Sequence, residues 1–291
     1  SDGDARGELS APLADLCPPP RALAGEPCTG TISCAILGGR LAHRHAEFIP
    51  LPPAIDSRGR SRPGCGVLVQ RAMKMKEIGA LDVRNQCSGF VYALSVADQF
   101  IKTGMYKNIL VIGSEKHSFG LDFSTRGRNV SVIFGDGAGA VVLQPTEEAN
   151  RGILSTHLHS DGSSAEILAM YNPGTHANHW TDHKLADFDE AEIAQMFMSH
   201  TMIDNAQLFP YMDGPAVFKK AVVKFPEVIV ESLKANKLTA KDINMLIPHQ
   251  ANLRISQFVQ QHLGLSDDQV HNNIQKYGNT TAASVPIALC E

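Results

Sequence analysis

Residues 82–104 read DVRNQCSGFVYALSVADQFIKTG, and this stretch decides the fold. After a short predicted strand at 81–83, the apolar residues that follow Cys87 are too widely spread for one helical stripe, which predicts a largely buried helix. Gly104 is expected to end that helix. The next run, NILVIGSE (108–115), is typical of a strand covered on both faces. A buried helix that leads into a doubly covered strand indicates an α/β protein.

The alternation continues on both sides of this stretch. Alternating strands and helices argue for an α/β fold with mainly parallel pairing. The remaining expected elements are a helix at 66–79, two strands around a glycine turn in 130–145, a strand at 153–161, a long amphipathic helix at 216–237 bent or interrupted at Pro226, a capping box at Thr239–Asp242, a strand at 243–248, a helix at 251–265, a short strand at 271–274 and the start of a helix at 281–291.

Composition and charge narrow the function classes. The chain has 291 residues, of which 43% are hydrophobic and 19% charged, and this is an ordinary balance for a soluble globular protein. A net charge of -4 gives no strong field toward nucleic acid or anionic membranes. No window approaches the roughly 18–20 apolar residues of a membrane span. The first residues, SDGDARGELSAP, lack the layout of a signal peptide, and the six cysteines are irregularly spaced, so we expect a cytoplasmic protein with reduced thiols.

The chain divides into three parts by composition. Residues 1–62 hold half of the 16 prolines and show no sustained period, so we expect a non-native or disordered segment. Ordered patterning begins at Pro63, and we expect two halves, 63–150 and 151–291. Within the second half, 161–213 is polar and resembles an insertion with one helical piece near 191–200.

Three residues have contexts that suit chemistry. Cys87 opens a helix, where free N–H groups and a partial positive charge favour thiolate, although a small buried hydrophobe is the commoner fate of a free cysteine. His249 closes a strand, at the sheet edge where open α/β folds place their sites, although a structural histidine is about as common. Asn279 lies at a strand-to-helix turn, where a capping role is the default.

Two other motifs are weaker. FGDGAGA (134–140) does not have the spacing of a dinucleotide loop and precedes a strand, so a tight turn near the site is expected instead. His176, His179 and His183 lack a supporting Cys or carboxylate scaffold, so no metal site and no cofactor is predicted.

Together with 82–104, four segments resemble the β-ketoacyl-ACP synthase III family in order and approximate spacing. They are RGRNVSVIFGDGAGAVVL (126–143), HSDGSSAE (159–166), IPHQANLRI (247–255) and YGNTTAASVPIAL (277–289). The resemblance covers about 63–291. It implies a thiolase-like fold with two similar halves in a layered α-β-α-β-α sandwich, usually dimeric.

The resemblance also implies a mechanism. Cys87 would take the acyl group of an acyl-CoA, and malonyl-ACP would then lose carbon dioxide. His249, through its Nε2–H, and Asn279 would stabilise the resulting enolate, which attacks the acyl-cysteine to give 3-oxoacyl-ACP in the initiation of fatty acid biosynthesis. By the same resemblance, Arg128 would lie near the CoA adenine, Phe218 would line the pantetheine tunnel, and Lys219 and Arg254 would dock the acyl carrier protein, with Lys220 and Lys224 as possible additions.

Three departures from the family pattern bear on activity. Nothing in 1–62 matches the family's opening segment, and Arg62 stands where an apolar residue is usual. The chain ends at Glu291, roughly 30 residues before the family's closing strands and glycine loop, which predicts a fragment or a defective copy. Two alternatives to the leading function therefore remain open: another thiolase-superfamily acyl transfer or polyketide starter condensation, and a catalytically inactive scaffold.

Overall fold

The computed structural model describes residues 65–118, 120–148, 151–170, 204 and 208–291. The expected segment at 1–62, the helical piece near 191–200 and the three histidines at 176, 179 and 183 lie outside the described residues. In chain order the elements, with η marking 3-10 helices, are α1 (Cys65–Ala72), η2 (Gln86–Ser88), α2 (Gly89–Lys102), β1 (Ile109–Glu115), η3 (Thr125–Gly127), α3 (Arg128–Ser131), β2 (Gly137–Leu143), η4 (Gly162–Ile167), β3 (Leu168–Ala169), β4 (Tyr211–Met212), α6 (Gly214–Ala235), η6 (Ala240–Asp242), α7 (Leu253–Leu263), η7 (Asp267–Gln269), α8 (Ile274–Tyr277), η8 (Thr281–Ala283) and α9 (Ser284–Cys290).

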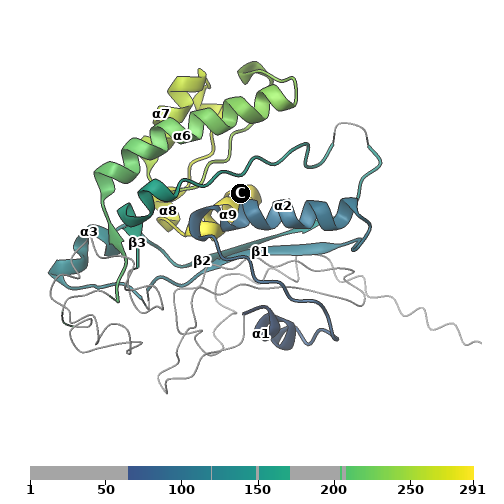
Figure 1. Cartoon of the computed structure of the whole chain (residues 1–291), viewed down its shortest axis with the longest axis horizontal. Helices are drawn as coiled ribbons and strands as arrows, with labels where there is room; N and C mark the ends of the chain where they lie inside the picture. Colours follow the sequence, from purple (N-terminus) through teal and green to yellow (C-terminus); the bar gives the residue numbers. More distant parts are fainter. Residues whose placement is uncertain (1–64, 119, 149–150, 171–203, 205–207) are drawn as a thin grey trace, which may run out of the picture.

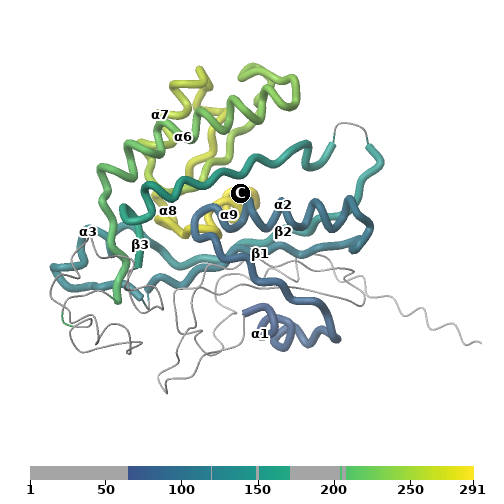
Figure 2. The backbone as a smooth tube through the Cα atoms, viewed as in Figure 1, coloured from purple at the N-terminus to yellow at the C-terminus, as the bar shows by residue number. Residues whose placement is uncertain are grey.

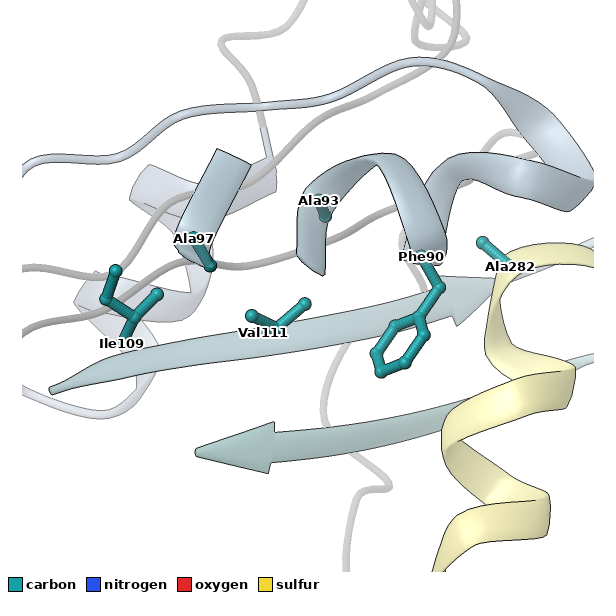
Figure 3. Close-up of a cluster of buried hydrophobic side chains, with 6 residues drawn as sticks. All are labelled: Phe90, Ala93, Ala97, Ile109, Val111 and Ala282. Atoms are coloured by element: carbon teal, nitrogen blue, oxygen red, sulfur yellow. The ribbon is translucent and has the colours of Figure 1, made fainter. Parts of the chain in front are cut away.

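Strand β1 is covered on both faces, as its sequence predicted. Ile109 and Val111 point toward α2 and belong to the main core cluster, as Figure 3 shows. Leu110 and Ile112 point the other way and pack with Cys65 of α1. Figure 1 accordingly shows α2 and α1 on opposite sides of the β1–β2 pair.

Helix α2 is largely buried, as expected, because only Val91, Gln99 and Lys102 of its 14 residues are exposed. Phe90, Ala93 and Ala97 are fully buried, whereas Val91 is 38% exposed. The two alanines carry short side chains, so the helix lies close to β1, and further apolar side chains of α2 pack partly buried against the same core. Gly104, with φ of 74°, follows the helix end as expected.

The strand pairing within the described residues is mainly antiparallel, which corrects the expected parallel pairing. β1 pairs antiparallel with β2 from Ile109–Leu143 to Glu115–Gly137, and β3 pairs antiparallel with β4. Parallel pairing occurs as two isolated bridges, Phe134–Asn279 and Leu246–Val270. The strands expected at 243–248 and 271–274 are thus reduced to one bridge, and 81–83 forms no strand.

The segment 151–161 is extended chain that joins no ladder, although a strand was expected there. Figure 2 shows it running between α2 and α6, and hydrogen bonds connect it to both helices. Thr156 Oγ1 lies 3.3 Å from Ser95 Oγ of α2, and His157 Nδ1 lies 3.0 Å from Glu231 Oε1 of α6. Side-chain contacts take the place of a backbone ladder in this layer.

The helices of the second half match their predicted positions. α6 is a single helix through the buried Pro226, so the alternative of an interruption there was wrong. Thr239 and Asp242 form the expected capping box. α7 packs against α6 and ends at Gly264, whose φ is 66°.

In the parts of the chain that the structure describes, we find no helix with the length and hydrophobicity needed to cross a lipid bilayer.

Candidate active site

Cys87 lies in a tight backbone turn immediately before α2. The preceding residue, Gln86, has φ of 40°, a left-handed conformation that side-chain-bearing residues rarely adopt. Gly89 begins α2 and is buried, and a Cβ placed there would lie 3.5 Å from the Cβ of Ala282. Figure 3 shows Ala282 beside the start of α2. The turn that carries Cys87 therefore packs directly on η8.

The electrostatic environment of Cys87 opposes thiolate formation. Burial, followed by the nearby Glu115 carboxylate, raises the pKa of the Cys87 thiol to about 12, and only its own backbone N–H acts in the other direction. The expectation that the helix start would favour the thiolate was wrong, because desolvation outweighs it. At neutral pH the resting site holds a neutral thiol.

Asn279 is fixed by its backbone and by its own side chain. Asn279 N–H donates to Ile133 O at 2.9 Å, and Gly135 N–H donates to Asn279 O at 3.0 Å. The Asn279 Oδ1 accepts from the backbone N–H of Thr281 at 2.9 Å. Because the amide oxygen is thus engaged, the Nδ2 protons of this buried side chain are the groups left to act on a ligand.

The glycine-rich segment 134–140 permits this arrangement. A Cβ at Gly135 would lie 2.1 Å from Tyr277 O, and one at Gly139 would lie 2.7 Å from Ile287 N. Of the two strands expected around a glycine turn, one forms, and its glycines allow the 277–287 segment to lie against β2. These glycines therefore shape the site by allowing other backbone to approach closely.

His249 is held by Ser284, the first residue of α9. His249 Nδ1 lies 2.6 Å from Ser284 Oγ, and Ser284 Oγ donates its single proton to Thr281 O at 2.8 Å. In that arrangement the hydroxyl accepts from His249, so Nδ1 carries the imidazole proton and Nε2 is an acceptor. If the hydroxyl donates to Nδ1 instead, Nε2 carries the proton, as expected from the sequence, and the 2.6 Å contact accommodates both tautomers.

The Nε2 of His249 is buried, and it has no hydrogen-bond partner among the described residues. Burial lowers the pKa of His249 to about 4, so the ring is neutral at pH 7. A buried polar atom without a partner is costly in a stable fold, and such atoms concentrate where a ligand binds. Nε2 is therefore the atom of His249 that is left without a partner at this candidate site.

The buried side chain of Gln250 anchors the backbone next to His249. Its Nε2 donates to Pro248 O at 2.9 Å and to His271 O at 3.1 Å. Its Oε1 accepts from the backbone N–H groups of Asn273 and Ile274 at 3.0 and 3.2 Å. Sequence reasoning missed Gln250 and Ser284, although a glutamine directly after the candidate histidine was a visible signal.

The three candidate catalytic residues therefore converge on one short segment, 279–284. Asn279 begins it, Ser284 at its end bonds to His249, and η8 between them packs on the Cys87 turn. Thr281 within it has φ of 40°, so positive-φ residues occur on both sides of the site. Such an arrangement suits covalent catalysis by a thiol with two polar groups beside it.

The four candidate binding residues lie on helices. Arg128 is exposed at the start of α3. Phe218 is half-buried and Lys219 exposed on α6, and Arg254 is exposed on α7, which packs against α6. The two suggested additional lysines are already ion-paired, Lys220 with Asp161 at 3.0 Å and Lys224 with Glu227 at 2.7 Å.

Among the described residues, no group of three or more His, Cys, Asp or Glu side chains is placed to hold a metal ion.

Comparisons with known proteins identify the class. The solved structure of 3-oxoacyl-[acyl-carrier-protein] synthase III from Aquifex aeolicus matches with a TM-score of 0.64 and 37% identity, over 80% of this chain and 63% of that one. The fold is thiolase-like α/β, the layered architecture of condensing enzymes.

The family follows from sequence. Models of 3-oxoacyl-[acyl-carrier-protein (ACP)] synthase III match residues 81–162 and, for its C-terminal part, residues 233–291. The β-ketoacyl-[acyl-carrier-protein] synthase III of Pasteurella multocida is 40% identical over 82% of this chain and 66% of its own length, and that of Pseudoalteromonas atlantica is 40% identical over 84% and 69%. The chain belongs to the 3-oxoacyl-ACP synthase III family, and it spans about two thirds of the length of the curated relatives it matches.

Proposed function

We propose that the protein is an acyltransferase that condenses an acyl-CoA with malonyl-ACP to give 3-oxoacyl-ACP, the first condensation of fatty acid biosynthesis. The single observation that carries this proposal is the 279–284 segment, which supplies Asn279, binds His249 through Ser284 and packs on the Cys87 turn. Family membership supports the same reaction.

In the first half-reaction, the Cys87 sulfur attacks the thioester carbonyl of acyl-CoA. The bond to the CoA sulfur breaks, and an acyl-cysteine remains. Since Cys87 rests as a neutral thiol, its proton has to leave as the new bond forms, and it ends on the departing CoA sulfur. In the tautomer that leaves it bare, the Nε2 of His249 suits the role of carrying that proton.

In the second half-reaction, malonyl-ACP loses carbon dioxide, and the electrons of the broken bond form an enolate. Asn279 Nδ2–H is a ready donor to the enolate oxygen, because Thr281 N–H occupies the amide oxygen. His249 is the second donor in the tautomer whose proton is on Nε2, in which the Ser284 hydroxyl donates to Nδ1. The enolate carbon attacks the acyl carbonyl, and the Cys87 sulfur leaves and is reprotonated.

Substrate docking is part of the same proposal. Lys219 and Arg254 project from neighbouring helices that pack together, and they suit an acidic carrier protein, while Phe218 beside Lys219 is half-buried and suits the pantetheine arm. Arg128 is the candidate contact for the CoA adenine. We also propose that the protein is cytoplasmic, which accords with the free thiols of Cys65, Cys87 and Cys290, and that it forms a homodimer, as the family resemblance implies.

Intact-mass spectrometry after incubation with acyl-CoA of several chain lengths tests the proposal. We expect a single acyl adduct that is lost in Cys87→Ser and retained in Cys290→Ser, a matched control at an exposed cysteine. Adding malonyl-ACP should then discharge the adduct as 3-oxoacyl-ACP. A folded protein that forms no Cys87-dependent adduct would contradict the enzyme assignment and leave a scaffold role. An adduct that malonyl-ACP fails to discharge would instead favour a different acyl acceptor.

A further inference from the structure

The buried hydroxyl of Ser284 lies within hydrogen-bond distance of three different groups. Ser284 is 2% exposed, so solvent hardly reaches its side chain. Its Oγ lies 2.6 Å from His249 Nδ1, donates to Thr281 O at 2.8 Å and accepts from the backbone N–H of Gln250 at 3.3 Å. The direction of its single proton is therefore decided by these protein groups and not by water.

Two arrangements of that proton satisfy the surrounding groups, because a hydroxyl has one proton and two lone pairs. When the proton points to Thr281 O, the lone pairs accept from Gln250 N–H and from His249 Nδ1–H, and Nε2 is an acceptor. When the proton points to Nδ1, Nε2 carries the imidazole proton instead. Thr281 O keeps a donor in either case, because the backbone N–H of Ser284 also donates to it. Turning one hydroxyl thus connects the two tautomers of His249 without leaving Thr281 O unbonded.

The proposed reaction needs both tautomers. Burial keeps the His249 ring neutral at pH 7 by lowering its pKa to about 4, so the ring carries one proton. To take the proton of Cys87 during acylation, Nε2 must be an acceptor, whereas to stabilise the enolate it must be a donor. Nε2 has no partner among the described residues, so whether it carries the proton decides which role it can fill.

We propose that Ser284 is a positioning residue that makes both tautomers of His249 available in turn. Its hydroxyl accepts from Nδ1 during acylation and donates to Nδ1 during condensation. Between the two half-reactions one proton leaves Nδ1 and one joins Nε2, so the exchange leaves the ring with a single proton. The inference rests on the proposed function, in which Cys87 is acylated before the enolate forms.

The test is the tautomer of His249 in Ser284→Ala. In this variant the hydroxyl oxygen is gone, and Gln250 N–H and His249 Nδ1 both face the position that it occupied. A second N–H beside the first has no acceptor there, so the ring proton should move to Nε2. NMR of protein labelled with nitrogen-15 in its histidines reads the tautomer from the chemical shifts of the two ring nitrogens at pH 7. His249→Gln identifies the His249 signals by their loss.

The same variant should separate the two half-reactions. With Nε2 protonated, His249 can no longer take up the Cys87 proton, so acylation should slow about 100-fold, whereas condensation of preformed acyl-enzyme should stay within about threefold of wild type. Ser232→Ala is the matched control, because Ser232 Oγ likewise donates to a carbonyl three residues earlier, Ile229 O at 2.9 Å, on α6. It should change neither the His249 shifts nor either rate.

Unchanged His249 shifts in Ser284→Ala, or equal slowing of the two half-reactions, would overturn the proposal. The wild-type spectrum gives a second reading that does not depend on how well the variant folds. In that spectrum Nδ1 must be at least partly protonated, and a ring protonated at Nε2 alone would also overturn the proposal. The spectra need no acyl-CoA, so this inference and the proposed condensation can fail independently.

Discussion

The two sides of the site are held in place by different means. On the nucleophile side, the backbone positions Cys87: Gln86 takes up a positive φ, and Gly89 allows the turn to lie on η8. On the donor side, side chains position the site, because Ser284 orients His249 and Gln250 connects Pro248 to the backbone of residues 271–274.

This difference indicates which substitutions should disturb each side of the site. A thiol held by backbone geometry tolerates changes in its neighbours' side chains but depends on packing against η8. A histidine held by hydrogen bonds loses its orientation, its tautomer or its local fold when a single polar neighbour is removed. Substitutions on the donor side should therefore separate the two half-reactions, and those in the anchoring network should reduce stability.

The largest effect is expected from Asn279→Ala. Loss of one preorganised donor to the enolate should slow condensation about 10²- to 10³-fold, which corresponds to about 3–4 kcal/mol. Acylation of Cys87 does not use the enolate donor, so the acyl adduct should still form at a rate within about threefold of wild type. Single-turnover kinetics with acyl-CoA alone and then with malonyl-ACP separates the steps.

The control for this variant is Asn244→Ala, at an exposed asparagine, which should change neither step. If Asn279→Ala slowed acylation and condensation equally, the two sides of the site would be mechanically coupled and could not be held by independent means.

The second effect is on stability and comes from Gln250→Leu. The substitution leaves the backbone N–H groups of Asn273 and Ile274 buried without their acceptor, and each such loss costs about 1–3 kcal/mol. We expect the free energy of unfolding to fall by about 3 kcal/mol in urea titrations. Gln257→Leu, on the exposed face of α7, should lie within about 0.5 kcal/mol of wild type. An equally small change in Gln250→Leu would show that the donor side is held by packing instead.

The secondary-structure elements that were predicted correctly are those whose sequence pattern lies within a few neighbouring residues. α2, α6, α7 and the capping box at Thr239 followed from patterns within a few residues, and they formed where expected. The pairing direction of β1 and β2 did not follow, because it depends on where residues 116–136 lead the chain. Likewise, the strands at 243–248 and 271–274 shrank to one bridge because their partners are set by the whole sheet.

The site shows the same division. Cys87, His249 and Asn279 were chosen from motifs, and the structure gathers them around 279–284, although their catalytic roles stay predictions. The hydrogen bond of His249 to Ser284 and the raised pKa of Cys87 were not foreseen, since they depend on Ser284 and Glu115, which are distant in sequence. Burial and neighbouring charge are properties of the assembled fold, and no motif encodes them.

The smallest of the three expected effects concerns the pH dependence of the free energy of unfolding. It tests His117, which contacts Thr281 next to the donor side of the site. Burial lowers the pKa of His117 to about 4, below its ordinary value of 6.5, so the unfolded chain takes up a proton first as the pH falls. The stability that His117 supports is complete above about pH 6.5 and is lost progressively as the pH falls toward 4. Between pH 7 and 5.5 this loss amounts to about 1 kcal/mol.

His117→Phe keeps a ring against Phe134 but cannot titrate, so its free energy of unfolding should fall by about 1 kcal/mol less than that of wild type over this interval. His262→Gln, at an exposed histidine, should follow the wild type. Parallel urea titrations at the two pH values measure this difference. An identical pH dependence in His117→Phe and wild type would mean that His117 is already solvated in the folded protein and does not stabilise the Asn279 turn.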